Sequence, residues 1–176
     1  MTKIVLGIGS NIGNRKAYII KAIELICRGR DFDFLALSPI YETEPWGFKE
    51  QKSFLNCILV CLSRLSPAEA MLALKRVELK TGRKRRPRWQ RREIDIDILF
   101  YSDRVIKSAD IEIPHPGIAN RNFVLKPLCD LMAEFVHPVL KKKIRGLYYS
   151  TPDRSKVKLF SQKLSQKIVK STVEFK

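Results

Sequence analysis

The sequence predicts an α+β fold, in which helices pack on a mainly antiparallel β-sheet. Several short segments alternate apolar and polar residues, as half-buried strands do, and two longer segments repeat apolar residues at helical spacing. The chain has 176 residues, of which 45% are hydrophobic, so it is long enough to bury the core of one domain. These segments follow one another in the order β-α-β-β-α-β.

The first three elements are a strand, a helix and a second strand. Residues 3–8 form a short apolar strand that leads into the turn Gly7-Ile8-Gly9-Ser10-Asn11. A helix over about residues 14–28 follows, because its apolar residues fall on one stripe: Ile19, Ile20, Ile23, Ile26 and Cys27. Residues 32–41 are predicted to be one strand.

The next three elements repeat this pattern. Residues 54–65 are predicted to be a strand. The capping sequence Ser66-Pro67-Ala68-Glu69 starts a helix that runs to about residue 80 and stops at Gly82. A strand over residues 95–101 follows.

Two shorter elements and a tail complete the chain. Residues 111–114 are expected to be an edge strand and residues 124–133 a helix. The order of the main elements is the split β-α-β arrangement of a ferredoxin-like sandwich. Residues 1–150 are therefore predicted to form a single domain, and residues 151–176 a basic C-terminal tail that is helical or disordered.

Composition limits the class of protein and its location. No apolar run is long enough to cross a bilayer, and the first residues lead into a strand rather than a signal peptide. Four cysteines lie in apolar segments without the spacing of a zinc site, which favours buried, reduced thiols: Cys27, Cys57, Cys61 and Cys129. We therefore expect a cytoplasmic protein with no membrane partner.

The net charge of +16 is concentrated in two segments. Residues 83–92 contain seven Lys and Arg and no acid, and residues 141–176 contain eleven against two acids, so the rest of the chain is neutral. A nucleic-acid-binding protein more often spreads basic residues over a folded face. Two localised clusters instead favour an anionic small-molecule site and a solvated tail.

The most informative stretch is Arg88-Trp89-Gln90-Arg91-Arg92-Glu93-Ile94-Asp95-Ile96-Asp97-Ile98-Leu99. Alternation places both aspartates on one face of a strand, roughly 7 Å apart, where their carboxylates repel and favour cations. Such oxygen ligands suit Mg²⁺, which completes its shell with water and substrate phosphate, and neighbouring arginines can hold the phosphates. The alternative is that Asp95 and Asp97 are only the solvated face of this strand.

Six motifs occur in a fixed order over about residues 3–138. They are Gly9-Ser10-Asn11; Tyr41-Glu42-Thr43-Glu44-Pro45-Trp46-Gly47; Phe54-Leu55-Asn56; Glu78-x-x-x-Gly82-Arg83; Arg88-Trp89-x-x-Arg92-x-x-Asp95-x-Asp97; and Pro114-His115-Pro116 followed by Asn120-Arg121-x-Phe123. Together they resemble the 6-hydroxymethyl-7,8-dihydropterin pyrophosphokinases, enzymes of folate biosynthesis. The resemblance implies an ATP-dependent pyrophosphokinase, here expected to be monomeric, that transfers pyrophosphate from ATP to the hydroxymethyl group of the reduced pterin and releases AMP.

The resemblance also implies the roles of charged residues. Asp95 and Asp97 would hold two Mg²⁺ ions and act in catalysis with Arg83 and Arg92, while Arg85 or Arg86 would help to clamp phosphates. ATP, the co-substrate, would be bound by Glu78, Arg83, Trp89, Arg92, Ile98, His115 and Arg121. Two of these have simpler interpretations on their own: a lone His115 is more often structural, and Glu78 could be a solvated helix charge.

The pterin side is predicted to be a flat slot. Asn56 offers a hydrogen-bond donor and an acceptor to the edge of the ring. The resemblance adds a stacking pair and a loop wall, so that the implied substrate-binding residues are Thr43, Glu44, Pro45, Trp46, Phe54, Asn56 and Phe123. Without the resemblance, both phenylalanines would be interpreted as ordinary core.

The chain departs from the family pattern between Trp89 and Asp95. That pattern has Gly-Pro where Gln90-Arg91 stand, and a small residue or Thr where Glu93 stands. Gln90 cannot adopt glycine's backbone conformations as cheaply, so this segment can follow a different path. Arg92 keeps its fixed spacing to Asp95.

Two other functions compete with this interpretation. An RNA-binding protein of the same fold would show the glycine-aromatic RNP1 pattern, which the sequence lacks, so no nucleic-acid partner is expected. A two-metal nucleotidyltransferase would use the same carboxylates but release pyrophosphate where the pyrophosphokinase releases AMP.

Overall fold

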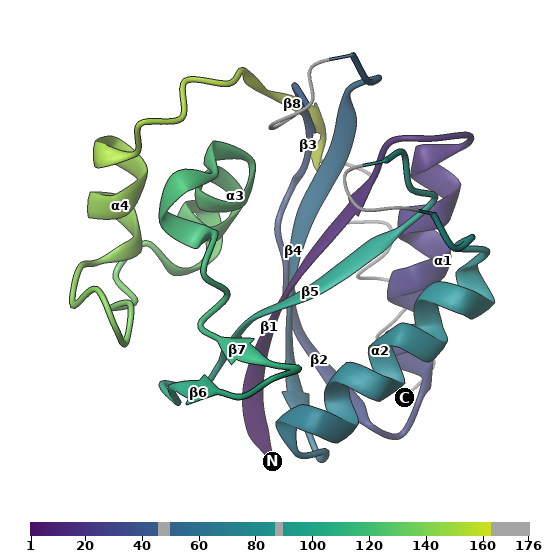
Figure 1. The fold of residues 1–176 in the computed structure, drawn as a ribbon, viewed down its shortest axis with the longest axis horizontal. Helices are drawn as coiled ribbons and strands as arrows, with labels where there is room; N and C mark the ends of the chain where they lie inside the picture. Colours follow the sequence, from purple (N-terminus) through teal and green to yellow (C-terminus); the bar gives the residue numbers. More distant parts are fainter. Residues whose placement is uncertain (46–49, 87–89, 163–176) are drawn as a thin grey trace.

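The centre of the molecule is a six-stranded sheet whose strand pairs are all antiparallel (Figure 1). The computed structural model describes residues 1–45, 50–86 and 90–162. The strands lie in the order β5-β1-β4-β3-β8, and β2 also pairs with β4. Their bounds are β1 Thr2–Ser10, β2 Phe32–Leu37, β3 Ile40–Thr43, β4 Phe54–Ser63, β5 Asp95–Tyr101 and β8 Val157–Ser161.

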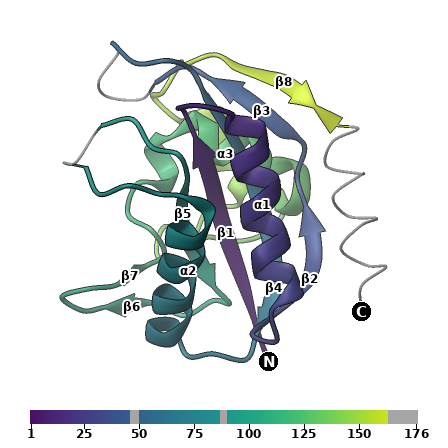
Figure 2. The ribbon, with the colours of Figure 1, turned by 90° about the vertical axis from the view of Figure 1, so that its right-hand side faces the viewer.

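Helices cover both faces of this sheet (Figures 1 and 2). Helices α1 (Arg15–Arg28) and α2 (Pro67–Thr81) lie side by side on one face, over a core that includes Leu6, Ile23 and Leu74. On the opposite face lie α3 (Asn122–Met132) and α4 (Ile144–Ser150), over a second core that includes Val5, Phe100 and Leu128. The predicted ferredoxin-like class is confirmed, and the second helical layer is additional to it.

Local sequence signals fix the ends of α2 as predicted. The Ser66 side chain accepts a hydrogen bond from the Glu69 N–H, and the Glu69 carboxylate accepts one from the Ser66 N–H at 2.8 Å. At the other end Gly82 has a φ of +117°, which favours glycine, and its N–H returns to the Glu78 and Leu79 carbonyls. This turn aims the chain from α2 toward β5.

The prediction of a single strand over residues 32–41 is wrong. The segment forms β2 and β3, separated at Ser38-Pro39, and both pair with β4. Pro39 has no N–H for a sheet ladder. The hydroxyl of Ser38 instead accepts a hydrogen bond from the Ile58 N–H at 2.9 Å, which keeps β4 paired across the break.

Two predictions for the later part of the chain need correction. The expected edge strand over residues 111–114 is β7 (Glu112–Ile113), which pairs with β6 (Ile106–Lys107) in a separate two-stranded sheet. A 3₁₀ turn over Ile118–Asn120 precedes α3. The predictions also missed α4, a short helix whose buried residues are Ile144 and Leu147.

The predicted tail contains a strand. Residues 157–161 are neither helical nor disordered but form β8, which pairs with β3 so that Tyr41 lies opposite Leu159 and Thr43 opposite Val157. The edge of β3 offers backbone donors and acceptors, and β8 satisfies them. Residues 163–176 lie outside the described part of the chain.

None of the helices in the described ranges combines the length and apolarity that crossing a bilayer requires.

Candidate active site

Two glycines on β1 form the floor of the site. In the sheet register Gly7 lies opposite Asp97, and Gly9 lies between Asp95 on one side and Asn56 on the other. A Cβ atom on Gly9 would stand 2.6 Å from Asn56 Oδ1, closer than side chains tolerate. Glycine at this position therefore lets the Asn56 amide lie flat on the sheet beside the carboxylates.

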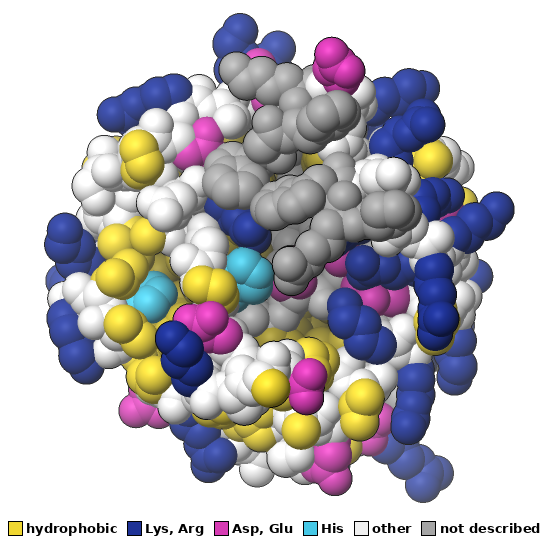
Figure 3. Space-filling model, in the orientation of Figure 1, with side chains coloured by type: hydrophobic (Ala, Val, Ile, Leu, Met, Phe, Trp, Pro, Cys, Tyr) yellow, Lys and Arg dark blue, Asp and Glu magenta, His cyan; other side chains and the backbone are white. Residues whose placement is uncertain are grey.

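A cavity of about 450 Å³ opens above this floor, on the face of the sheet that carries α3. This volume is in the range of small-molecule sites. It brings together ten of the residues predicted from the sequence: Thr43, Glu44, Phe54, Asn56, Arg92, Asp95, Asp97, His115, Arg121 and Phe123. In the view of Figure 3, which has the α3 and α4 layer on the left and the α1 and α2 layer on the right, a histidine and acidic side chains lie near the centre and most Lys and Arg side chains lie toward the edges.

One end of the cavity, here called the acidic end, is built around Asp95 and Asp97 with Arg92, His115 and Arg121. The alternation of β5 turns both aspartates toward the cavity, while Ile96 between them is buried under α1 and α2. Arg92 Nη1 pairs with Asp95, and Arg83 Nη1 donates to Asp95 Oδ1 at 2.6 Å. Asp95 is therefore held between two guanidinium groups.

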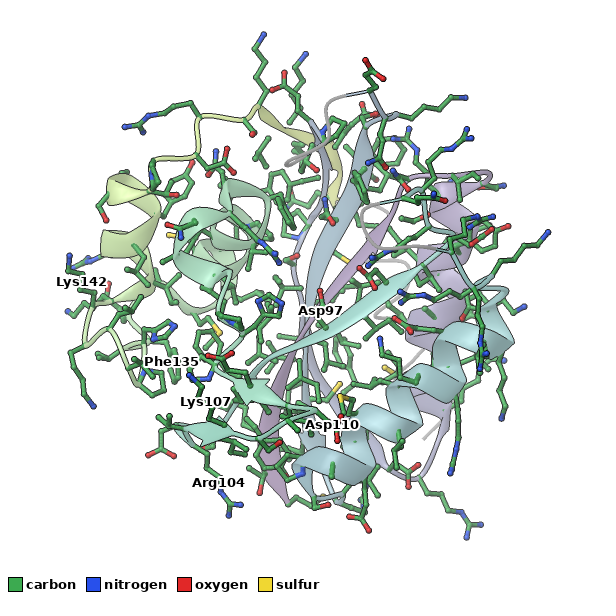
Figure 4. All side chains as sticks on the ribbon, viewed as in Figure 1. Asp97, Arg104, Lys107, Asp110, Phe135 and Lys142 are labelled. Carbon is green, nitrogen blue, oxygen red and sulfur yellow. The ribbon has the colours of Figure 1, made fainter. Side chains whose placement is uncertain are left out.

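Asp97 differs from Asp95 in its partners. Within the described ranges, no ion pair or hydrogen bond engages its carboxylate, which projects from β5 near the middle of the molecule (Figure 4). Burial, and then the charge of Asp95, raises the pKa of Asp97. A carboxylate in this situation gains from a nearby cation.

The donors at the acidic end fit a magnesium ion that arrives with a polyphosphate. Among the described residues, no three His, Cys, Asp or Glu side chains cluster as a metal cage. Mg²⁺ does not need one, because it commonly takes one or two carboxylates and fills its shell with water and phosphate oxygens. Asp95 and Asp97 provide this oxygen set.

His115 and Arg121 reach the acidic end from the segment before α3. The His115 N–H donates to the Leu99 carbonyl, and its Nδ1 accepts from the Gly117 N–H at 3.0 Å, which leaves Nε2 to carry the proton of the neutral ring. Burial lowers the pKa of His115, and Asp97 offsets part of that effect. A Cβ atom on Gly117 would stand 2.5 Å from the Arg121 guanidinium, so this glycine makes room for the arginine.

The other end of the cavity, here called the neutral end, is formed by Thr43, Phe54, Asn56 and Phe123. Asn56 Nδ2 donates to Thr43 Oγ1 at 2.7 Å, which fixes the orientation of the buried amide. Phe54 and Phe123 are only half-buried and line the cavity, so the alternative that both are ordinary core does not describe them. Amide, hydroxyl and aromatic rings can bind a flat polar heterocycle.

The C-terminal segment supports both walls of the neutral end. Glu44, exposed at its rim, accepts a hydrogen bond from the Lys156 N–H at 3.2 Å and donates its own N–H to the Lys156 carbonyl. Asp153 Oδ2 accepts from the Asn122 N–H at 2.8 Å, at the start of α3 and one residue before Phe123. Pro45 is described but does not line the cavity.

Glu78 is not a solvated helix charge, because only 1% of it is exposed. Its carboxylate pairs with Arg83 and Lys75 and accepts the Ile96 N–H at 2.7 Å, so it ties α2 to β5. Burial raises the pKa of Glu78 against the charges of these two cations. Neither Glu78 nor Ile98 lines the cavity, and Ile98 packs against the core under α1 and α2.

Asn11 is a connecting residue whose role the sequence did not reveal. Its side chain accepts the Arg92 N–H at 2.7 Å and donates to Gln51 Oε1 at 2.9 Å, and its own N–H donates to the Arg92 carbonyl. Gln51 lines the cavity and was also missed. The only sequence signal for Asn11 was its place in the Gly9-Ser10-Asn11 motif.

The basic segment is anchored by Glu93. Its carboxylate accepts two hydrogen bonds from Arg86, both at 2.7 Å, which lower the pKa of Glu93 to about 2. Arg86, predicted with Arg85 as a possible phosphate ligand, pairs with Glu93 in this structure. The predicted residues Trp46 and Trp89 lie outside the described residues.

Comparison with known proteins identifies the family. Residues 5–133 match the family model described as 7,8-dihydro-6-hydroxymethylpterin-pyrophosphokinase (HPPK). The chain belongs to the HPPK family. As its sequence predicts, it is therefore a pterin pyrophosphokinase of folate synthesis.

Relatives and solved structures agree with this assignment. The chain is 41% identical to the 2-amino-4-hydroxy-6-hydroxymethyldihydropteridine pyrophosphokinase of Aquifex aeolicus over 145 residues, 82% of this chain and 89% of the relative. It is 35% identical to the folic acid synthesis protein fol1 of Pneumocystis carinii over 85% of this chain but only 20% of that protein. The fold is shared with the HPPK-DHPS of Plasmodium falciparum, with a TM-score of 0.68 and 18% identity over 85% of this chain and 43% of that one.

Proposed function

We propose that the two ends of this single cavity divide the pyrophosphokinase reaction between them. The acidic end holds the ATP phosphates with Mg²⁺, and the neutral end holds 6-hydroxymethyl-7,8-dihydropterin. The observation that carries the proposal is that the carboxylates of β5 and the amide of β4 face the same cavity, with only glycine backbone between them.

In this reaction the hydroxymethyl oxygen of the pterin attacks the β-phosphorus of ATP. A bond forms between that oxygen and the β-phosphorus, the bond from the β-phosphorus to the oxygen bridging it to the α-phosphate breaks, and AMP leaves. The hydroxyl proton passes to solvent. Because charge shifts among phosphate oxygens, the protein's contribution is positioning and charge neutralisation.

Cationic and neutral donors at the acidic end act on the phosphates. Arg92 and Arg121 line the cavity and bind phosphate oxygens, and Arg83 joins them through its place beside Asp95. The neutral His115 donates a hydrogen bond from its Nε2–H to a phosphate oxygen, since its Nδ1 is occupied by the Gly117 N–H. Since Arg83 and Arg92 already pair with Asp95, binding of the nucleotide exchanges some of these contacts for contacts with phosphate.

Asp95 and Asp97 are the proposed ligands of two magnesium ions. The bound ions would neutralise the triphosphate and increase the acidity of the attacking hydroxyl. The raised pKa of Asp97, due to burial and the charge of Asp95, supports a cation at this point. The residues therefore fit the metal, and no separate general base is assigned.

The neutral end orients the pterin. Asn56 presents Oδ1 and its remaining N–H to the edge of the ring, because its other N–H is used by Thr43. Phe54 and Phe123 flank the ring, and Glu44 lies at the rim. Glu78 is buried, so its proposed contribution to ATP binding is made through Arg83, with which it pairs, and Ile98 remains a proposed ATP contact outside the cavity lining. At this end the pterin would be recognised by uncharged hydrogen-bonding groups and by the shape of the cavity.

Product analysis tests the assignment. The purified chain, incubated with ATP, Mg²⁺ and 6-hydroxymethyl-7,8-dihydropterin, should form AMP and the pterin diphosphate, as measured by ³¹P NMR and chromatography. No pterin-dependent AMP would refute it. Release of pyrophosphate would instead favour the nucleotidyltransferase alternative.

The remaining proposals concern location and assembly. We propose that the enzyme is cytoplasmic. We also propose that it is monomeric, since one chain supplies both ends of the cavity. Light scattering of the purified chain tests the second point: a mass near 20.4 kDa supports it, and a multiple of that mass contradicts it.

A further inference from the structure

Glu93 occupies an unusual place in the charge distribution. It directly follows the ten-residue basic segment 83–92, which has seven Lys and Arg and no acid. Although it is charged, only 5% of Glu93 is exposed. Burying a carboxylate is costly unless it is well paired, so its partners define its role.

Glu93, which follows the basic segment, is bonded to residues at the start of that segment. Arg86 donates from both terminal nitrogens, each at 2.7 Å, in a bidentate pair, and the Lys84 N–H donates at 3.3 Å. Arg86 Nη1 also donates to the Arg91 carbonyl at 3.2 Å. One carboxylate thus fixes residues 84 and 86 against residues 91 and 93.

These fixed positions are next to the arginines of the acidic end. Arg83 precedes Lys84, and Arg92 precedes Glu93. Both arginines pair with Asp95, one from each flank. The pair between Glu93 and Arg86 therefore fixes the backbone of Arg83 relative to that of Arg92.

We propose that Glu93 is a positioning residue for the phosphates of ATP. By binding Arg86 and the Lys84 N–H, it holds the two backbone flanks from which Arg83 and Arg92 reach the acidic end. It also makes Arg86 a structural partner rather than a phosphate ligand. This inference rests on the proposed function of the acidic end.

The opposing interpretation is that Arg86 binds phosphate itself and that Glu93 only holds it in the absence of nucleotide. The two make different predictions for a charge swap. If Arg86 and Glu93 act as a pair, Arg86→Glu combined with Glu93→Arg restores the contact in reverse. If Arg86 must meet phosphate, the swap cannot restore it.

The experiment compares steady-state kinetics of the wild type, Glu93→Gln, Arg86→Glu and the double variant. We expect Glu93→Gln and Arg86→Glu to raise KM for ATP about tenfold, about the effect of losing one charge-assisted hydrogen bond, with KM for the pterin within about twofold. The double variant should recover most of the loss. Glu134→Gln is the control, because Glu134 pairs with Lys143 and Arg145 and does not line the cavity.

The outcomes separate this inference from the function on which it rests. Wild type that forms no pterin-dependent AMP overturns the proposed function. Active wild type with an unchanged ATP KM in Glu93→Gln overturns the positioning role, as does a double variant no better than Arg86→Glu. Melting temperatures are measured in parallel, and affinity for a non-hydrolysable ATP analogue with Mg²⁺ replaces KM for any variant too slow to assay. An equal change in both substrates' constants would indicate a merely structural role and would also overturn the proposal.

Discussion

The two ends of the cavity are held in place by different forces. At the acidic end charged side chains are held by ion pairs: Arg83 and Arg92 pair with Asp95, and Arg86 pairs with Glu93. At the neutral end an uncharged hydrogen bond to Thr43 holds Asn56, whose amide lies on the glycine floor. The acidic end is therefore sensitive to charge, whereas the neutral end is sensitive to shape.

Their origins along the chain differ in the same way. Most of the acidic end comes from one continuous stretch, residues 83–97. The neutral end combines β3, β4 and the start of α3, and its walls are joined by the C-terminal segment. The acidic end thus depends mainly on the local path of one segment, while the neutral end depends on the packing of distant parts of the chain.

The largest effect is expected when the carboxylates are neutralised. Asp95→Asn or Asp97→Asn should lower kcat by about 10³-fold or more, because magnesium contributes several kcal/mol of charge stabilisation. The melting temperature should stay near that of wild type, since no core packing is lost. Asp33→Asn, which removes a surface pair with Arg64, is the control and should leave kcat unchanged. Turnover close to wild type in either cavity variant would contradict the metal assignment.

The next effect belongs to the neutral end alone. Asn56→Ala should raise KM for the pterin by about 5- to 150-fold, the equivalent of ~1–3 kcal/mol for a lost buried hydrogen-bonding group, with little change in KM for ATP. Thr43→Ser keeps the hydroxyl that Asn56 contacts and should stay much closer to wild type. A matching rise in both Michaelis constants would show that the two ends do not act separately.

The sequence revealed some parts of the site better than others for a physical reason. A strand with period two places Asp95 and Asp97 on one face whatever surrounds it, so local spacing was sufficient. The burial of Glu78 and the links made by Asn11 depend on segments far apart in the chain, and no local pattern reports them. The tail was misjudged for the same reason, because β8 forms only where the edge of β3 is available.

A smaller effect is expected from removing that strand. Deletion of residues 152–176 removes β8 and Asp153, so it should lower the melting temperature by ~2–4 °C for each kcal/mol lost and raise KM for the pterin more than KM for ATP. Deletion of residues 163–176 retains β8 and is the matched control. If the two deletions have equal effects, or if the shorter protein keeps the melting temperature of wild type, β8 and Asp153 do not stabilise the neutral end.

The smallest effect concerns acid stability at the neutral end. Burial raises the pKa of Asp153, but hydrogen bonds from Ser155 and the Asn122 N–H outweigh it, so the pKa lies below the ordinary 3.8. A carboxyl with a lowered folded-state pKa stabilises the fold fully above its unfolded pKa and loses that contribution as pH falls through the folded one. The difference in unfolding free energy between wild type and Asp153→Asn should be constant above about pH 5 and shrink below about pH 4. A difference that grows on acidification would have the wrong sign.

The central claim is that Asp95 and Asp97 hold the metal ions that accompany ATP. The most direct test counts bound Mn²⁺, a paramagnetic substitute for Mg²⁺, by electron paramagnetic resonance in the presence of a non-hydrolysable ATP analogue. The wild type should bind two ions per chain, and Asp97→Asn should lose at least one of them. Unchanged stoichiometry and affinity in Asp97→Asn and in Asp95→Asn would contradict the claim.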